Sequence, residues 1–273
     1  EQMKTLEDWK NEWRIDMESM DPKLDDLIEE FIPEEPTYSV IAGRSGIGKT
    51  VLGLNLAFAM ATGSTFYGLK VKKTIVGYLA FEGTKGKMFE RLEKIGNNYP
   101  QAGDNLHFEL LKPFYLFKNK ESERRFLDLV AGCHVVFVDP LKYLIGGDYT
   151  KPAVANEFII RFMELMDKGK FSAVLCMQVR KSNPNSLIEP GDLWEIKGAG
   201  DYVESATSVL LLEKERQGHK PEGGFALASI DKVILHFAKH RDAIGDMNSI
   251  KLKLNRGKLR FDKRHNNNTY NNT

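Results

Sequence analysis

Cysteine is scarce in this sequence of 273 residues, which contains only Cys133 and Cys176, each within an apolar run. Two distant cysteines and six scattered histidines provide no zinc-ligand spacing. The apolar surroundings favour two small buried side chains over a disulfide or metal ligands, as is typical of a protein from a reducing, intracellular compartment. We therefore expect a cytoplasmic protein without a zinc centre.

Long hydrophobic runs are also absent, since no apolar stretch approaches the roughly 18 residues that a membrane-spanning helix needs. We therefore expect no membrane partner. The sequence begins with Glu1 rather than Met, so we expect the native chain to begin further upstream. No Ser-His-Asp arrangement for nucleophilic catalysis can be placed, and we interpret His134, at the start of an apolar run, as a core or strand-edge residue.

A large excess of one charge is missing as well, because the net charge is only +1, but the charges are unevenly distributed. Residues 1–35 contain 13 acidic and 4 basic side chains, and the rest of the chain contains 25 acidic and 35 basic ones. An acidic arm on a basic body favours binding of a polyanion. A solvated acidic helix explains the same distribution equally well, so the charge pattern leaves both interpretations open.

Residues 1–35 are predicted to form an acidic helical arm. Within residues 5–20, apolar side chains that include Trp9 and Trp13 recur at helical spacing, which indicates an amphipathic helix. A second short helix is predicted over 23–31. Two tryptophans on one face of an acidic helix require a partner surface, which is either the body of the same chain or an adjacent subunit.

Residues 36–262 are predicted to form one α/β domain, because short apolar runs alternate there with helical segments. Strands are predicted at 37–42, 74–81, 134–138, 172–178 and 207–212. Helices are predicted near 49–61, 84–96, 121–131 and 153–168. This alternation is typical of a mostly parallel, doubly wound sheet flanked by helices.

The last part of this domain is predicted to be β-rich, at 225–238 and 249–262. In the second of these segments, apolar residues alternate with lysines and arginines on both sides of a turn at Arg256-Gly257. We therefore expect a β-hairpin with one apolar and one basic face. The Asn-rich tail, 263–273, is expected to be disordered.

A complete G-x-x-x-x-G-K-[ST] motif lies between a predicted buried strand and a predicted helix. Its residues are Gly43, Arg44, Ser45, Gly46, Ile47, Gly48, Lys49 and Thr50. The glycines let backbone N–H groups curl around a polyphosphate, and the helix N-terminus adds a favourable dipole. Lys49 supplies a positive charge to the β- and γ-phosphates, and the Thr50 hydroxyl is a ligand for Mg²⁺. A merely structural glycine-rich turn does not explain the Lys-Thr pair.

Polar side chains follow three of the other predicted strands, at the edge where ligands of open α/β sheets bind. Asp139 ends the apolar run 135–138 and is placed to hold the metal through water, although it could simply cap the next segment. Glu82 ends the strand 74–81, where a carboxylate can polarise the attacking water; the alternative is a plain strand-end glutamate. Gln178 ends its own strand, and its amide is placed to sense the γ-phosphate.

The order of these features resembles that of the RecA-like P-loop ATPases. Within that group, the sequence is most similar to RepA-type plasmid replicative helicases and to the C-terminal motor of DnaB-type helicases, over residues 30–245. The segments that carry the similarity include Tyr78-Leu79-Ala80-Phe81-Glu82-Gly83, Asp139-Pro140-Leu141 and Ala238-Lys239-His240-Arg241. The last segment is similar to the DnaB-type Lys-x-Arg motif, whose cations reach the γ-phosphate bound to the neighbouring subunit.

The resemblance implies a RecA-like fold, ATP and Mg²⁺ as ligands, and ATP hydrolysis that drives a homohexameric ring along single-stranded DNA as a replicative helicase. The residues expected to carry the chemistry are Lys49, Glu82, Gln178, Lys239 and Arg241. One alternative is a RecA-like regulatory ATPase that uses ATP to switch its assembly without unwinding. Another is a recombination or repair ATPase that forms a filament on DNA.

The resemblance also implies that the loops after the Asp139 strand and the Gln178 strand, about 140–153 and 179–200, face the central channel of the ring. Cations next to an aromatic residue suit the backbone and stacked bases of a single strand. The residues expected to contact nucleic acid are Lys142, Arg180, Lys181 and Lys197. Ordinary solvated loop charge is the alternative for each of them.

Overall fold

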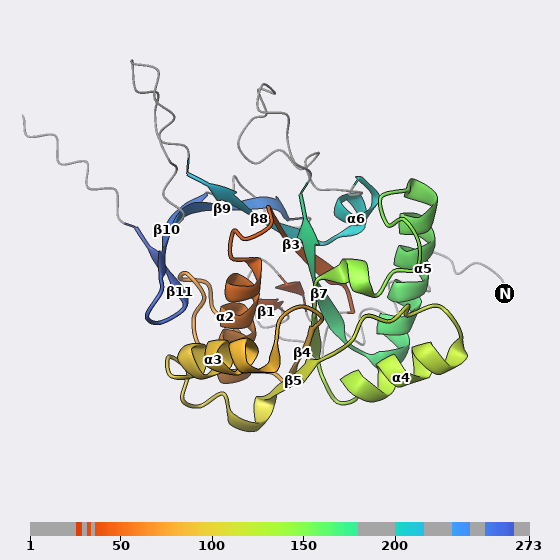
Figure 1. The fold of residues 1–273 in the computed structure, drawn as a ribbon, viewed down its shortest axis with the longest axis horizontal. Helices are drawn as coiled ribbons and strands as arrows, with labels where there is room; N and C mark the ends of the chain where they lie inside the picture. The colour runs from red at the N-terminus through yellow and green to blue at the C-terminus, as the bar shows by residue number, and fades with distance from the viewer. Residues whose placement is uncertain are drawn as a thin grey trace, which may run out of the picture.

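The computed structural model describes residues 26–28, 32–33, 36–179, 200–215, 231–240 and 249–264. The core of this described part is a nine-stranded sheet with the order β11-β10-β9-β8-β3-β7-β6-β4-β5 (Figure 1). Its strands are β3 (Tyr38–Gly43), β4 (Val76–Ala80), β5 (Leu106–Leu110), β6 (Val135–Asp139), β7 (Ser172–Gln178), β8 (Ser208–Lys214), β9 (Lys232–His240), β10 (Ile250–Asn255) and β11 (Arg260–Lys263). The strands from β8 to β5 are parallel, whereas β9, β10 and β11 are antiparallel additions. The predicted mostly parallel sheet is thereby confirmed.

Helices cover both faces of this sheet. α2 (Lys49–Thr62) and α3 (Lys85–Gly96) lie on one side of the central strands, and α4 (Lys120–Val130) and α5 (Pro152–Gly169) lie on the other (Figure 1). These are the four predicted helices, with small shifts at their ends. Side chains cap two of them: Thr84 accepts a hydrogen bond from the Lys87 N–H at the start of α3, and Asn119 accepts one from the Ser122 N–H at the start of α4.

Shorter elements complete the described part. α6 (Gly200–Ser205) packs against α5, and two 3₁₀ turns lie at η1 (Gly103–Asn105) and η2 (Leu141–Tyr143). Neither α6 nor β5 is predicted from the sequence. β5 is an edge strand with half-buried residues alternating with exposed ones, unlike the continuous apolar runs of the other parallel strands.

Alternate residues of the central strands pack against opposite helical layers. In β6, Val135 and Phe137 belong to the cluster that contains α2 and α3, whereas Val136 and Val138 belong to the cluster that contains α4 and α5. All four side chains are fully buried. A strand that is covered on both faces needs an unbroken apolar run. The last residue of this strand, Asp139, lies at the carboxyl edge of the sheet.

The short helix predicted over 23–31 is wrong for its described part. Asp26–Ile28 form strand β1, which pairs antiparallel with strand β2, Ile32–Pro33. The Leu27 carbonyl accepts a hydrogen bond from the Lys72 N–H at 3.0 Å, and the Leu27 side chain is buried in the core. Backbone pairing with a distant segment therefore overrides the local helical pattern. The helix predicted over 5–20 and residues 265–273 of the predicted disordered tail lie outside the described residues. The prediction is wrong for Lys263, the first residue of that tail, which belongs to β11.

The C-terminal hairpin of β10 and β11 confirms the predicted apolar and basic faces. Leu252 and Phe261 are buried, whereas Lys251 and Lys253 are exposed. The hairpin is tied to α2, because the Asn55 side-chain amide donates a hydrogen bond of 2.8 Å to the Leu259 carbonyl. The hairpin thus packs beside the first turns of the helix that follows the glycine-rich loop. The β-rich segment predicted at 225–238 is confirmed for residues 232–238, which lie in β9.

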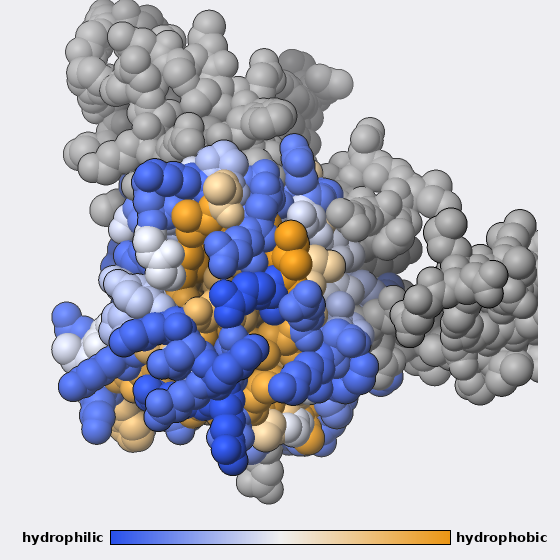
Figure 2. All heavy atoms as spheres, turned by 90° about the vertical axis from the view of Figure 1, so that its right-hand side faces the viewer, coloured by the Kyte–Doolittle hydropathy of each residue, from blue (hydrophilic) through white to orange (hydrophobic). Residues whose placement is uncertain are grey.

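The side of the molecule at the right of Figure 1 carries exposed apolar side chains between charged ones (Figure 2). Ile160 and Met163 of α5 are 60% and 47% exposed. The inner face of α5 is buried against the sheet, so Ile160 and Met163 belong to its outer face. No helix in the described part of the chain is both long and apolar enough to span a membrane.

Candidate functional site

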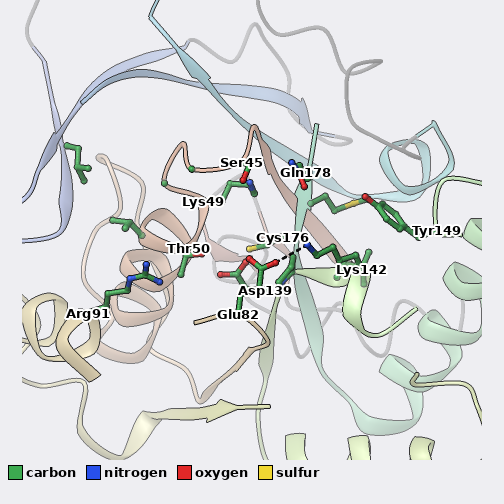
Figure 3. A pocket seen from close by; sticks show the side chains of 17 residues that line it. Ser45, Lys49, Thr50, Glu82, Arg91, Asp139, Lys142, Tyr149, Cys176 and Gln178 are labelled. Carbon is green, nitrogen blue, oxygen red and sulfur yellow. Dashed lines mark ion pairs between the residues drawn. The ribbon is translucent and has the colours of Figure 1, made fainter. Parts of the chain in front are cut away.

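A cavity of about 300 Å³ opens at the carboxyl ends of the parallel strands (Figure 3). It is lined by the loop between β3 and α2, by the residues that follow β4 and β6, by the end of β7, and by single residues of α3 and β10. The predicted site residues that line it include Lys49, Thr50, Glu82, Asp139, Lys142 and Gln178. Sheet topology therefore brings together side chains that lie far apart in the sequence.

The loop between β3 and α2 wraps around its own lysine. The Lys49 ammonium donates hydrogen bonds to the carbonyls of Gly43 and Arg44, at 2.9 and 3.0 Å. Gly46 and Gly48 have φ angles of +74° and +109°, a backbone conformation that favours glycine. The resulting curl is the shape expected of a loop that presents backbone N–H groups to phosphate oxygens.

The remaining side chains of the loop lie in different surroundings, and Arg44 is exposed and does not line the cavity. Ser45 lines the cavity, whereas Ile47 is 4% exposed and belongs to the hydrophobic core. A Cβ atom on Gly48 would lie only 2.6 Å from the Phe261 ring, so the hairpin packs directly on the loop. α2 begins at Lys49, and its N-terminal N–H groups therefore face the cavity, where they favour an anion.

The charge on Lys49 is controlled by two opposing effects. Burial lowers the pKa of its ammonium below the usual value, and the nearby carboxylates of Asp139 and Glu82 oppose that shift. Figure 3 shows the three side chains converging on the centre of the cavity. A polyphosphate bound here would add negative charge next to the ammonium and favour its protonated form.

Asp139 is held by two hydroxyl groups. It is 6% exposed, the Tyr78 hydroxyl donates a hydrogen bond of 2.8 Å to its Oδ2 atom, and the Thr50 hydroxyl also bonds to the carboxylate. Burial raises the pKa of Asp139, and the two hydroxyl groups and the Lys49 charge oppose this shift. The contact between Thr50 and Asp139 brings two oxygen ligands of the kind that Mg²⁺ prefers to one point, so the pair fits a magnesium site.

Glu82 follows β4 and is held from the opposite side of the cavity. Lys142 forms an ion pair with its Oε1 atom at 2.8 Å, and the Tyr143 hydroxyl donates a hydrogen bond to the same atom at 3.0 Å. Partial burial favours the neutral acid, but these two contacts and the Lys49 charge hold the pKa of Glu82 below its usual range. The carboxylate is therefore ionised, as a group that accepts a proton from water must be.

The other predicted site residues fall into three groups. Gln178 lines the cavity at the end of β7, beside the loop that follows β3. Lys239 lies on β9, where its ammonium donates hydrogen bonds to the carbonyls of Val203 and Glu204, both at 2.6 Å. Those that lie outside the described residues are Arg180, Lys181, Lys197 and Arg241.

Two side chains at the site, Tyr78 and Arg91, were not singled out in the sequence, whereas Tyr143 is the aromatic residue noted in the loop 140–153. In the sequence, Tyr78 is one of several residues in an apolar run that predicts a buried strand. A buried tyrosine hydroxyl needs a hydrogen-bond partner, and that requirement could have identified Tyr78 as a site residue. Tyr143 follows the Asp139 strand closely enough to contact the site. Arg91 enters the cavity from α3, and Figure 3 shows its side chain extending toward Thr50; no sequence pattern indicates this approach.

Comparison with known protein families agrees with this geometry. The model of a family described as AAA domain matches residues 4–184, which is more than half of the chain. The comparison with curated proteins finds no match.

Solved structures with the same fold cover nearly the whole chain. One, described as an ATPase domain, superposes with a TM-score of 0.66 at 13% sequence identity, covering 97% of this chain and 100% of that chain. A DnaB-like replicative helicase, whose structure was described with its interactions with primase, superposes with a TM-score of 0.64 at 15% identity, covering 96% of this chain and 67% of that chain. At such identities the similarity concerns the fold, and it confirms the expected RecA-like core.

Proposed function

Since this chain belongs to the AAA domain family, we propose that it is an ATP-hydrolysing motor that assembles into a hexameric ring and moves along single-stranded DNA, as a RepA-type replicative helicase does. The observation that carries this proposal is the cavity in which Lys49, Thr50, Asp139 and Glu82 converge. The fold shared with the ATPase domain and with the DnaB-like replicative helicase supports the choice of a helicase motor over other ATPases.

Each side chain of the cavity then has a chemical role. Lys49 and the N–H groups of its loop bind the β- and γ-phosphates. Thr50 and Asp139 hold Mg²⁺, which when bound neutralises charge on the transferred phosphoryl group. Glu82 accepts a proton from the attacking water and orients it toward phosphorus. Gln178, at the end of the neighbouring strand β7, hydrogen-bonds the γ-phosphate and reports its presence to the loop that follows.

The ring is proposed from Lys239 and from Arg241, which follows it closely in the sequence. Arg241 comes directly after β9, whose Lys239 does not line the cavity of the described residues. A guanidinium supplied by a neighbouring subunit can be worth about 10³–10⁵ in turnover. We assign this role to Arg241, with Lys239 assisting, so that each active site is completed at a subunit interface.

We assign the binding of nucleic acid to the loop that follows β7. Its three cations, Arg180, Lys181 and Lys197, are referred to below as the channel cations. Their positive charges suit the phosphates of a single strand that passes through the ring. In this arrangement the Gln178 amide, at the start of the loop, links the γ-phosphate to the nucleic acid.

The proposal is tested by measuring the ATPase rate with and without single-stranded DNA, together with the particle mass in solution. We expect DNA to stimulate turnover and the mass to correspond to a ring. Turnover that is insensitive to DNA, from particles that change mass with ATP, would instead identify a regulatory ATPase. DNA-stimulated turnover from open filaments would identify a recombination or repair ATPase.

A further inference from the structure

Lys142 lies in the cavity as a second lysine facing the phosphate loop. It follows β6 within η2, lines the same cavity as Lys49, and is close enough for the two ammonium charges to repel each other. Figure 3 shows its side chain reaching toward the centre of the cavity, opposite to the side from which Arg91 enters. The sequence predicts that this cation contacts nucleic acid, and none of the roles assigned to the cavity uses it.

The partner of Lys142 is the carboxylate to which we assign the chemical step. Its ammonium lies 2.8 Å from the Glu82 Oε1 atom and 4.5 Å from the centre of the Tyr143 ring. The Lys142 side chain is 32% exposed and the Glu82 side chain is 55% exposed. An ion pair this accessible to water contributes little stability, so a stronger anion in the cavity can replace Glu82.

We propose that Lys142 is the specificity-determining residue that makes the site prefer ATP to ADP, because the γ-phosphate takes the place of Glu82 at its ammonium. This inference rests on the proposed function, in which Lys49 binds the β- and γ-phosphates. A terminal phosphate brings about two negative charges at neutral pH, against one on a carboxylate. ADP ends one phosphate earlier, and in its complex the pair between Lys142 and Glu82 persists.

The exchange of partners also explains why the pair lies in the active site. While Lys142 and Tyr143 bind Glu82, its Oε1 atom is occupied and the ammonium lowers the basicity of the carboxylate. Once the γ-phosphate has taken Lys142, Glu82 keeps only the Tyr143 hydroxyl as a partner and becomes a stronger base toward the water. Hydrolysis removes the γ-phosphate and restores the original pair. The residue thereby couples recognition of ATP to the freeing of the base.

The test compares the affinities for Mg²⁺-ADP and for a non-hydrolysable ATP analogue, measured by calorimetry on the full chain. The variants are Lys142→Met, which keeps the length of the side chain without its charge, and Lys142→Arg, which keeps the charge. Lys151→Met is the matched control, because Lys151 lies exposed at the start of α5 and does not line the cavity. The affinity for ADP serves as an internal measure of correct folding.

We expect Lys142→Met to weaken binding of the analogue by about tenfold while ADP binding changes by less than about twofold. Lys142→Arg and Lys151→Met should keep the ratio of the wild type. An equal change for both nucleotides, or no change for either, would overturn the inference. Because the analogue is not hydrolysed, this result does not depend on turnover: a wild-type protein that binds both nucleotides but shows no ATPase activity would refute the proposed function and not this inference.

Discussion

Removal of the Tyr78 hydroxyl tests how the Asp139 carboxylate, to which we assign Mg²⁺ binding, is held. Tyr78 is fully buried, and its ring stacks between Phe108 and Phe137 with centroid distances of 5.9 and 5.4 Å. Tyr78→Phe preserves that stacking and removes only the donor that bonds to Asp139 at 2.8 Å. Asp139 is 6% exposed, so little water is available to replace the lost bond.

The size of the effect follows from the type of hydrogen bond. A hydrogen bond to a charged group is worth about 1.5–3 kcal/mol, and for a domain of this size each kcal/mol shifts the midpoint of thermal unfolding by about 2–4 °C. We therefore expect Tyr78→Phe to lower the midpoint by about 3–12 °C. The Asp139 carboxylate also loses one of its two hydroxyl partners, so the additional stabilisation by Mg²⁺ in the presence of ADP should become smaller.

Tyr202 provides a matched control for the same chemical change. It is also fully buried, but its hydroxyl has no hydrogen-bond partner among the described residues. Tyr202→Phe removes an unsatisfied polar group and should be neutral or stabilising. The assay is thermal unfolding of both variants with ADP, with and without Mg²⁺. Equal midpoints for the two variants, or an unchanged Mg²⁺ effect in Tyr78→Phe, would refute the reasoning.

Three further predictions concern the nucleic acid, the ring and pH. Replacing the channel cations together by Ala should weaken single-strand binding and flatten its salt dependence, measured by fluorescence anisotropy, while the basal ATPase rate survives. Arg241→Ala and Lys49→Ala subunits, each nearly inactive alone, should recover ATPase activity when mixed in one ring, because a phosphate loop of one variant then faces the Arg241 of the other. An assembled, DNA-bound Arg241→Ala protein with normal turnover would contradict the role assigned to Arg241. The pKa of Glu82 is lowered in the folded state, so its pairing with Lys142 stabilises the protein at pH values above the unfolded pKa of about 4.3. The difference in thermal midpoint between wild type and Lys142→Met should therefore vanish as the pH falls through the lowered pKa.

The features that the sequence predicts well are those encoded within a single segment. The phosphate loop is recognisable because its glycines, lysine and threonine lie within eight positions. β6 is recognisable because burial on both faces demands the apolar run 135–138, and Asp139 then stands at the edge of the sheet. Glu82 and Gln178 follow from the same rule, since both come at the ends of buried strands.

The features that the sequence does not predict depend on contacts between segments. Leu27 belongs to a strand because Asp26–Ile28 pair with Ile32–Pro33, and its carbonyl also accepts a hydrogen bond from the distant Lys72 N–H, a contact that leaves no local signal. The position of Lys142 in the loop 140–153 predicts contact with nucleic acid, and this stays a prediction. Its contact with Glu82 is visible only in the folded chain. Arg91 reaches the cavity through the packing of α3, and helical periodicity does not distinguish it from other surface cations.

The central claim, that this cavity hydrolyses ATP with Glu82 as the base, is tested most directly by one comparison. Nucleotide binding and Mg²⁺-dependent ATP turnover are measured for the wild type, for Glu82→Gln and for Lys49→Ala. We predict that Glu82→Gln keeps nucleotide binding and loses turnover by about 10²–10⁴, the usual contribution of a positioned base, whereas Lys49→Ala loses both. A Glu82→Gln protein that turns over ATP at the wild-type rate would contradict the account and require another carboxylate to activate the water.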